Sequence, residues 1–280
     1  MERSKKIAVI TGASSGMGRE FARRIEEKYR GELDEIWLIA RRRERLEALA
    51  SELKTHARAI PLDLSGSMGT DEYAALLEAE KPDVRVLVNA AGFGIFGTFE
   101  KMELDRQLAM IDLNEKALVA MTYHSLPYMH KGAEIFELGS LSAFQPVPYI
   151  NVYGATKAFV LSFTRALNVE LKKCVRGIRA MAVCPGWVKT EFFDTAVRDD
   201  TITYYNRYYT AEQVVARAMR DMARGKDVSV CGAAIRAQVR LTKLLPHKLV
   251  MAIWCRQQKK KCPCSYRHTP MNTDLQTYNQ

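Results

Sequence analysis

The sequence predicts an α/β protein in which one parallel, doubly wound sheet carries helices on both faces. Short runs of β-branched and other apolar residues alternate with longer amphipathic stretches, which is the order of strands and helices in such a fold. Turns rich in glycine and other small residues follow several of these runs. With 280 residues, of which 48% are apolar, the chain can bury one sizeable core. In a doubly wound sheet the turns after the strands meet at one edge, where ligands bind.

The first predicted strand, Lys6–Thr11, leads directly into a glycine-rich turn and then into a helix. A strand, a glycine-rich turn and a helix N-terminus together direct backbone N–H groups at a phosphate. Side chains in place of Gly12, Gly16 and Gly18 would hold a pyrophosphate away from the backbone. The spacing therefore predicts a dinucleotide site in this turn.

The end of the second predicted strand, Glu35–Ala40, distinguishes between two cofactors. An acidic residue there would bind the adenosine ribose hydroxyls and repel a 2′-phosphate. The chain instead has Arg41, Arg42 and Arg43, and a guanidinium pairs well with a phosphate. We therefore predict NADP(H) as the cofactor, with Arg41 as the main phosphate ligand and Arg42 as the second. Arg43 and Arg45 are expected to be solvated at the start of the next helix.

Four more strands are expected, each followed by small or polar residues. They span about 57–62, 84–88, 133–138 and 178–184, and helices are expected at about 44–53 and 71–80. A long helical pattern from about Leu104 to Met129 carries Asn114 in its middle. Asparagine has only a modest helix propensity, so we expect a specific hydrogen bond at this position.

Tyr153 and Lys157 lie at the start of a long apolar helix that follows the fifth strand. Residues four apart share one face of a helix. An ammonium held beside a phenol favours the phenolate and lowers a pKa that is ordinarily about 10. Such a phenol can exchange a proton with an alcohol or a ketone near neutral pH. This spacing also occurs by chance on helix surfaces, so the interpretation depends on the other motifs.

Six motifs occur in the order and spacing of one known family. They are T-G-x-x-x-G-x-G at 11–18, N-A-A-G at 89–92, Asn114, Ser140, Y-x-x-x-K at 153–157 and P-G-x-x-x-T at 185–190. Over roughly residues 5–232 the chain resembles a classical short-chain dehydrogenase/reductase, and within that family it resembles the hydroxysteroid dehydrogenases. The resemblance implies a Rossmann-like, three-layer fold for residues 1–232. It also implies a homodimer or a homotetramer.

The resemblance further implies a role for each motif residue. Tyr153 would be the catalytic acid and base, while Lys157 would lower its pKa and hold the nicotinamide ribose. Ser140 would hydrogen-bond the reacting oxygen, and Asn114 would anchor a water in a proton relay. Ser140 is chosen over Ser142 because the family places its serine thirteen residues before the tyrosine. The other implied cofactor residues are Gly12, Ser14, Ser15, Gly16, Met17 and Gly18 in the phosphate turn, Asp63 and Leu64 beside the adenine, Asn89 in the central sheet, and Val188 and Thr190 at the carboxamide.

Residues 191–210 are expected to close the substrate pocket, as in the family. This segment contains Phe192, Phe193, Tyr204, Tyr205, Tyr208 and Tyr209. Aromatic side chains suit a bulky apolar substrate, and they equally suit packing on the body or on a second subunit. Phe144 replaces the family's usual glycine and is expected to line the pocket. We expect a bulky ketone or alcohol substrate, such as a hydroxysteroid or bile acid. The alternatives are a 3-oxoacyl or small-carbonyl reductase and a non-catalytic NADP(H)-sensing or scaffold protein.

Residues 233–280 form a basic C-terminal extension. The chain has a net charge of +10, and nine of its 42 lysines and arginines but none of its 32 acidic residues lie between Val228 and Thr273. The rest of the chain is therefore nearly neutral, which argues against nucleic-acid binding. Leucines and a tryptophan interleave with the basic residues of the extension, as in an amphipathic helix. Such a helix would lie on an anionic membrane surface, cover the substrate mouth or contact another subunit.

Other features of the sequence bear on location and metals. The chain has no run of 18 apolar residues and no apolar leader, and its six cysteines are scattered. These features favour a cytoplasmic protein, with peripheral membrane association as the alternative. We expect no metal site, because hydroxyl groups would polarise the carbonyl, and Cys262 and Cys264 lack partners at zinc-like spacing.

Overall fold

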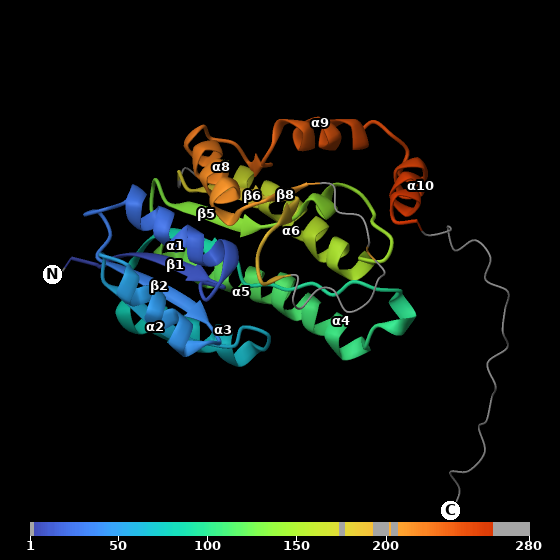
Figure 1. The fold of residues 1–280 in the computed structure, drawn as a ribbon. Coiled ribbons are helices and arrows are strands. Elements are labelled where there is room, and N and C mark those ends of the chain that lie inside the picture. The colour runs from blue at the N-terminus through green and yellow to red at the C-terminus, as the bar shows by residue number, and fades with distance from the viewer. Residues whose placement is uncertain (1–2, 174–176, 193–201, 203–206, 260–280) are drawn as a thin grey trace, which may run out of the picture.

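The computed structural model describes residues 3–173, 177–192, 202 and 207–259, and these contain a sheet of seven parallel strands (Figure 1). The strand order is β3-β2-β1-β4-β5-β6-β9. The strands are β1 (Lys6–Thr11), β2 (Glu35–Ala40), β3 (Ala57–Pro61), β4 (Asp83–Asn89), β5 (Glu134–Leu138), β6 (Arg179–Val183) and β9 (Val228–Ser229). The chain proceeds outward from β1 in one direction and from β4 in the other. The predicted doubly wound α/β fold is therefore confirmed.

Helices cover both faces of the sheet. They are α1 (Gly16–Lys28), α2 (Arg43–Glu52), α3 (Ser67–Glu80), α4 (Leu104–Ile111), α5 (Leu118–Ser125), α6 (Asn151–Lys173) and α8 (Ala211–Ala223). Buried side chains of α1, α2 and α8 belong to one apolar cluster, and those of α3, α5 and the end of α6 belong to the other. The result is the three-layer arrangement expected from the alternation of strands and helices.

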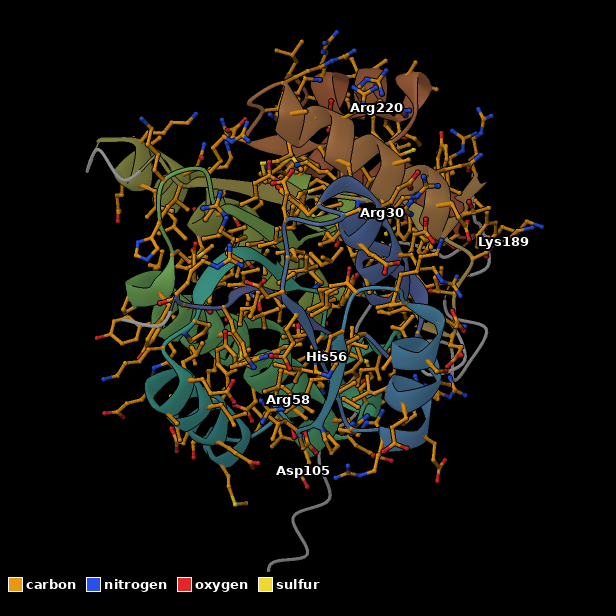
Figure 2. The ribbon with its side chains drawn as sticks, turned by 90° about the vertical axis from the view of Figure 1, so that its left-hand side faces the viewer. Arg30, His56, Arg58, Asp105, Lys189 and Arg220 are labelled. Carbon is orange, nitrogen blue, oxygen red and sulfur yellow. The ribbon has the colours of Figure 1, made fainter. Side chains whose placement is uncertain are left out.

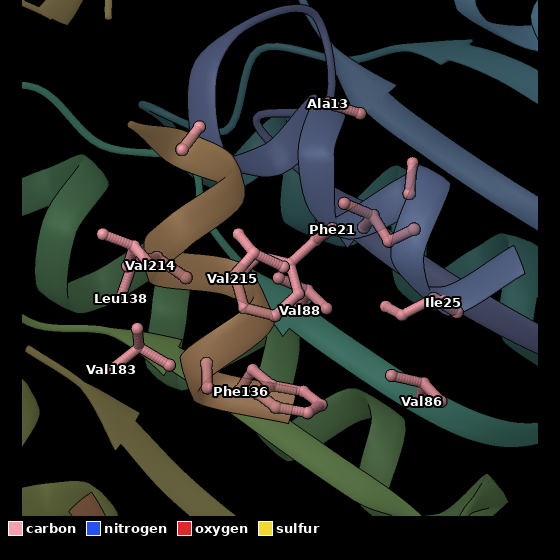
Figure 3. Close-up of a cluster of buried hydrophobic side chains, with 14 of the residues drawn as sticks. Ala13, Phe21, Ile25, Val86, Val88, Phe136, Leu138, Val183, Val214 and Val215 are labelled. Carbon is pink, nitrogen blue, oxygen red and sulfur yellow. The ribbon is translucent and has the colours of Figure 1, made fainter. Parts of the chain in front are cut away.

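The core forms because successive strand residues point to opposite faces of the sheet. In β1, Ala8 and Ile10 belong to the cluster beneath α1 and α8, and Ile7 and Val9 belong to the other cluster. Figure 3 shows side chains of α1 and α8 meeting above the central strands. The labelled residues are Ala13, Phe21, Ile25, Val86, Val88, Phe136, Leu138, Val183, Val214 and Val215. Burial of each large apolar side chain stabilises the fold by about 1.5–3 kcal/mol.

The helix expected from Leu104 to Met129 is interrupted. It consists of α4, a π-helical segment Asp112–Ala117, α5 and a 3-10 turn Leu126–Tyr128. Asn114 lies in the π-helical segment, a wider turn that is frequent at functional sites. The 3-10 turn contains Pro127, which cannot donate a helical hydrogen bond.

The C-terminal part of the described chain lies outside the sheet. A short parallel pair, β7 (Trp187–Val188) and β8 (Tyr208–Tyr209), precedes α8. After β9 the backbone turns at Gly232, whose φ is +89° and where a Cβ would collide with the Tyr209 hydroxyl. Two further helices follow, α9 (Ala233–Thr242) and α10 (His247–Gln257). Figure 1 shows α9 above the sheet and α10 to its right.

The surface of the α/β body carries charges of both signs. Figure 2 shows nitrogen and oxygen atoms mixed around its outline. Four of the labelled side chains are exposed, namely Arg30, Asp105, Lys189 and Arg220. Within the described residues, no helix is both long enough and apolar enough to cross a bilayer.

Candidate active site

A cavity of about 360 Å³ lies at the carboxyl edge of the sheet. The residues that follow β4, β5 and β6 form its floor, and the start of α6 forms one wall. The lining includes Ser140, Tyr153 and Lys157, three of the four predicted catalytic residues. The fourth, Asn114, lies directly behind Gly92, because a Cβ on that glycine would be 2.8 Å from the Asn114 Oδ1. The structure thus brings all four together.

Tyr153 and Ser140 present their hydroxyl groups to the cavity as a pair. Ser140 is near enough to oppose the rise of the Tyr153 pKa, and the Ser142 backbone N–H donates to the Ser140 Oγ at 3.2 Å. The Tyr153 ring packs against Phe96 and Phe192, with centroid distances of 5.8 and 5.6 Å. These contacts hold two hydroxyl groups where both can reach one substrate oxygen.

Lys157 is buried below the tyrosine. Its Nζ donates to the Leu138 carbonyl oxygen at 2.7 Å and lies 5.7 Å from the centroid of the Tyr153 ring. The ammonium therefore lies near the Tyr153 ring. Leu138 is the last residue of β5 and lies two residues before Ser140 in the chain. Its hydrogen bond therefore holds the buried Lys157 side chain next to the turn that carries Ser140.

The pKa of Tyr153 differs from the sequence-based expectation. Burial raises the pKa of Tyr153 to about 12. The Ser140 side chain lowers this pKa, but by less than burial raises it. Burial also lowers the pKa of Lys157 to about 8, so its positive charge is itself weakly held. The expected lowering of the phenol pKa by Lys157 is absent, because desolvation of the phenol dominates.

Asn114 connects three parts of the site. Its Nδ2 donates to the Phe93 carbonyl oxygen at 2.9 Å and to the Thr156 Oγ1 at 3.1 Å. Its Oδ1 accepts from the Phe93 N–H at 3.1 Å. The specific hydrogen bond expected at Asn114 is therefore present. It joins the loop after β4 to α6, one residue before Lys157, and the role in a water relay stays a prediction.

The turn after β1 has the geometry of a phosphate cradle. Gly12 and Gly16 have φ values of +65° and +53°, and a Cβ on Gly12 would lie 2.7 Å from the Ala90 carbonyl oxygen. A Cβ on Gly18 would collide with the Gly12 carbonyl oxygen. The N-cap residue of α1, Ser15, makes no side-chain cap bond, and the first turn carries no acidic residue. The N–H groups at the start of α1 suit a pyrophosphate.

Arg42 lies closer to the phosphate turn than Arg41 does. The Arg42 Nη2 and Nε lie 3.0 and 3.3 Å from the Ser14 Oγ. The Arg41 Nη1 instead lies 4.0 Å from the Asp63 carboxylate, and 74% of its side chain is exposed. Glu191 pairs with Arg42 at 2.9 Å and with Arg45 at 2.6 Å. Sequence reasoning ranked Arg41 first and left Arg45 to solvent. The structure favours Arg42 and gives Arg45 an ion-pair partner.

We expect the change Arg42→Gln to weaken NADPH binding about tenfold or more and to leave NADH binding nearly unchanged. A charge-assisted hydrogen bond to a phosphate contributes roughly 1.5–3 kcal/mol, and only NADPH has the 2′-phosphate. Fluorescence titration of both cofactors measures the two dissociation constants. Arg45→Gln is the matched control, because Arg45 also pairs with Glu191 but does not contact Ser14. A larger loss of NADPH affinity in Arg41→Gln than in Arg42→Gln would show that Arg41 is the main phosphate ligand, as the sequence predicts.

The remaining predicted cofactor residues divide into two groups. Val188 and Thr190 line the cavity, as does Met17, and the Thr190 methyl group lies 3.2 Å from where a Gly16 Cβ would be. Asp63 accepts two hydrogen bonds from Ser65, and the buried Leu64 belongs to the core beneath α3. Asn89 is buried and does not line the cavity, whereas its neighbours Ala90 and Gly92 do. Contact of these residues with the cofactor stays a prediction.

Sequence reasoning missed a buried carboxyl group beneath the site, Glu137 in β5. Its Oε1 accepts from the Thr122 Oγ1 at 2.9 Å and from the Asn89 Nδ2 at 3.2 Å. Its Oε2 and the Asn89 Oδ1 have no protein partner. Burial raises the pKa of Glu137 to about 8, partly opposed by these hydrogen bonds and by Lys157. Its position within a strand of apolar character gave no signal that could have revealed this cluster.

Glu137 should make the stability of the fold depend on pH. Between the ordinary glutamate pKa of about 4.5 and about 8, the folded chain keeps a proton that the unfolded chain releases. Stability therefore falls as pH rises through this window. In urea unfolding between pH 5 and pH 8, we expect the wild type to lose roughly 3 kcal/mol more than Glu137→Gln does. Parallel stability curves for the two proteins would show that Glu137 does not carry this proton.

The C-terminal helices contribute residues that sequence reasoning did not place in the site. The cavity wall includes Gln238, Val239, Leu245, Trp254 and Gln257 from α9, α10 and the turn between them. The Trp254 Nε1 donates to the Pro148 carbonyl oxygen at 3.1 Å, which attaches α10 to the loop before α6. The described part of the predicted extension, residues 233–259, thus forms part of the cavity wall, and the domain division at residue 232 stays a prediction.

The expected aromatic segment contributes in part. Phe192 and Phe144 line the cavity, as predicted, whereas Tyr208 and Tyr209 do not. Phe193, Tyr204 and Tyr205 lie outside the described residues, as do Cys262 and Cys264. Among the described residues, no three histidine, cysteine, aspartate or glutamate side chains gather in an arrangement that suits a metal.

The phosphate cradle and the tyrosine–serine–lysine set at one sheet edge define the site of a nucleotide-dependent oxidoreductase. A family model described as short chain dehydrogenase matches residues 6–201. The chain belongs to the short-chain dehydrogenase family.

Three similar proteins illustrate the family. The NADP-dependent 3-hydroxy acid dehydrogenase of Salmonella typhi is 35% identical over 198 residues, which are 69% of this chain and 77% of that protein. A short-chain dehydrogenase from Sphingobium yanoikuyae, solved in complex with NADPH, superposes with a TM-score of 0.71 at 28% identity and covers 88% of this chain and 95% of its own. The bulky-bulky ketone specific alcohol dehydrogenase from Comamonas testosteroni superposes with a TM-score of 0.66 at 26% identity, with coverages of 88% and 93%.

Proposed function

We propose that this protein interconverts a bulky, apolar ketone and the corresponding secondary alcohol. The chain is an oxidoreductase acting on hydroxyl and carbonyl groups, and its cofactor is NADP(H). The observation that carries the substrate proposal is the cavity lining. Lys157 is the one cationic side chain among the described residues that line the cavity, and it is bonded to the Leu138 carbonyl oxygen. Lys243 lies beside this wall, with its Nζ 5.5 Å from the centroid of the Phe144 ring. The lining itself is mostly apolar or uncharged, which suits a neutral substrate better than an anionic one.

The chemistry follows from the positions of two hydroxyl groups. NADPH, when bound, supplies the hydride to the carbonyl carbon. The Tyr153 hydroxyl keeps its proton at neutral pH, because its pKa is about 12, and it can donate this proton to the carbonyl oxygen. Ser140 donates a hydrogen bond to the same oxygen as negative charge develops there. In the oxidation direction Tyr153 must first lose its proton, and the burial that raises its pKa to about 12 opposes that loss.

The cofactor fits the residues that are present. Gly12 and Gly18 leave space for a pyrophosphate close to the backbone of the turn, and Arg42 beside Ser14 supplies a cation for the 2′-phosphate. Val188 and Thr190, which line the same cavity as Lys157, would border the nicotinamide end.

A small-carbonyl reductase is the second candidate. It is favoured by the Salmonella relative, whose name gives a 3-hydroxy acid as substrate. The bulky-ketone proposal is favoured by the cavity and by the Comamonas structure, whose name gives bulky ketones. The two candidates differ in the charge and the size of the substrate.

A kinetic comparison separates the candidates. NADPH consumption is measured with steroid and bile-acid ketones, with neutral aryl ketones, and with short 3-oxo acids and 3-oxoacyl thioesters. We expect kcat/KM for the best bulky apolar ketone to exceed that for the 3-oxo acids by at least tenfold, because the short acids leave the apolar wall unfilled. The reverse order would overturn the proposal. NADPH binding without turnover of any ketone would support a non-catalytic, cofactor-sensing protein.

We further propose a homodimer or homotetramer formed through α4 and α6. These helices pack together and expose Leu104, Leu108, Phe159 and Val169, with exposed fractions from 39 to 64%. Apolar residues on neighbouring helices favour association with a second copy of the same face. Light scattering of the full chain measures the mass, and Leu108→Glu should lower it to that of a monomer.

A further inference from the structure

The last two described helices expose a group of apolar side chains, here called the C-terminal patch. Its members are Leu241, Leu244, Leu249 and Ile253, which are 56, 82, 47 and 44% exposed. Leu249 and Ile253 are four residues apart in α10 and share one face. Leu244 lies in the turn between α9 and α10 and is the most exposed large apolar side chain among the described residues.

The C-terminal patch is surrounded by charges of one sign. Arg240, Lys243, Lys248, Arg256 and Lys259 are exposed around it. No acidic residue occurs in the sequence between Val228 and Thr273. The α/β body differs, because its surface mixes both signs (Figure 2). The patch therefore combines exposed apolar side chains with a strongly positive field.

The C-terminal patch continues into the cavity. Leu241 and Ile253 are exposed, and both also line the cavity. Between them, Trp254 and Leu245 form part of the cavity wall, and Trp254 is fixed by its bond to Pro148. The exposed Gln238 and Gln257 also line the cavity, so exposed apolar and uncharged polar side chains of α9 and α10 border it together.

Three kinds of partner can be compared. A second copy of this chain would bring the five cations of one patch against those of the other, which costs energy without acidic partners. A nucleic acid would satisfy the cations but would leave the leucines without apolar contacts. An anionic lipid surface satisfies both, because headgroups attract the cations while the leucines enter the boundary of the acyl chains.

We propose that α9 and α10 dock on an anionic membrane surface and open the cavity toward the lipid. The docked face consists of the C-terminal patch and the five cations around it. A hydrophobic substrate dissolved in the bilayer would then reach Tyr153 between Leu241 and Ile253 without crossing water. This substrate route rests on the proposed function, whereas the membrane contact itself does not.

Co-sedimentation of the full chain with vesicles tests the contact. Vesicles of phosphatidylcholine alone are compared with vesicles that also contain phosphatidylglycerol. We expect binding to the anionic vesicles at least tenfold tighter than to the neutral ones, with loss of binding at high salt. The double change Leu244→Glu/Leu249→Glu should weaken binding at least tenfold, and Lys248→Gln/Arg256→Gln should remove most of the preference for anionic lipid.

Matched controls separate docking from a general surface effect. Met68 is 81% exposed on α3, so Met68→Glu makes the same apolar-to-acidic change elsewhere and should leave vesicle binding unchanged. Arg30→Gln/Lys101→Gln removes two exposed cations of the body and should also have no effect. Equal binding of all variants, or no binding of the wild type to anionic vesicles, would overturn the proposal.

A second measurement distinguishes failure of docking from failure of the proposed function. Leu244 and Leu249 do not line the cavity, so Leu244→Glu/Leu249→Glu should reduce a water-soluble ketone at the wild-type rate. The same variant should lose at least tenfold in activity on a ketone embedded in anionic vesicles. If the wild type binds anionic vesicles but reduces no ketone, the proposed docking surface is supported and the proposed reaction is refuted.

Discussion

Replacement of Tyr153 by phenylalanine is expected to lower kcat/KM about 1,000-fold, because the substrate oxygen loses its proton donor. Positioned general acids contribute about 10²–10⁴ in rate. The phenylalanine ring should still pack against Phe96 and Phe192, so the fold and the cavity should survive the change. NADPH titration should give a dissociation constant within about threefold of wild type, well below the tenfold step of 1.4 kcal/mol.

Tyr73→Phe is the matched control for this experiment. Tyr73 is also hydrogen-bonded to a serine, since its hydroxyl lies 2.7 Å from the Ser125 Oγ, but it is a buried residue of α3 that does not line the cavity. Loss of the Tyr73 hydroxyl should lower the free energy of unfolding by about 1 kcal/mol and leave kcat/KM unchanged. Full activity of Tyr153→Phe, or an equal loss in both variants, would remove Tyr153 from the proton-transfer role.

The same tyrosine predicts opposite pH profiles for the two directions. With a Tyr153 pKa of about 12, the phenol stays protonated across neutral pH, so ketone reduction should vary little between pH 6 and pH 8. Alcohol oxidation needs the phenolate, so its rate should rise with pH over the same range. Steady-state rates in both directions measure the difference.

Gly12→Ala is expected to have the second large effect, on cofactor binding and on stability together. Alanine at a φ of +65° costs roughly 1–2 kcal/mol, and its Cβ would lie 2.7 Å from the Ala90 carbonyl oxygen. The turn after β1 must then move away from the loop after β4, which displaces the N–H groups that face the phosphates. We expect NADPH to bind about 100-fold more weakly, equivalent to about 2.7 kcal/mol.

Gly31→Ala isolates the contribution of the backbone. Gly31 also has a positive φ, +78°, but a Cβ there would meet no atom within 4 Å. This variant should lose only the roughly 1–2 kcal/mol of backbone strain and should bind NADPH normally. Thermal unfolding and cofactor titration of both variants test the difference. Equal NADPH affinities of Gly12→Ala and Gly31→Ala would show that the close approach to Ala90 is not needed.

The parts of the site that sequence predicted are those set by local backbone. Gly12, Gly16 and Gly18 are recognisable because positive φ values and close approaches restrict those positions to glycine. Tyr153 and Lys157 are recognisable because helical spacing fixes their common face. The parallel, doubly wound sheet is predicted from the alternation of short apolar runs and helices, whereas the order of its strands comes from the structure.

The parts that sequence could not predict depend on contacts between distant segments. Arg41 and Arg42 are neighbours in sequence, and only the position of Ser14 shows which one faces the phosphate turn. The raised pKa of Tyr153 depends on how deeply α6 is buried, which no spacing reveals. Glu137 gives no signal in sequence because its partners, Asn89 and Thr122, come from two other elements.

The attachment of α9 and α10 has a consequence for how this protein can change over generations. These helices join the body at Gly232 and at the bond from Trp254 to Pro148, and they carry none of the four predicted catalytic residues. Mutations in residues 233–259 can therefore reshape the cavity while the proton-donating hydroxyl and the phosphate cradle stay intact. Part of the substrate wall is therefore encoded apart from the reacting groups, so selectivity can diverge while reactivity is preserved.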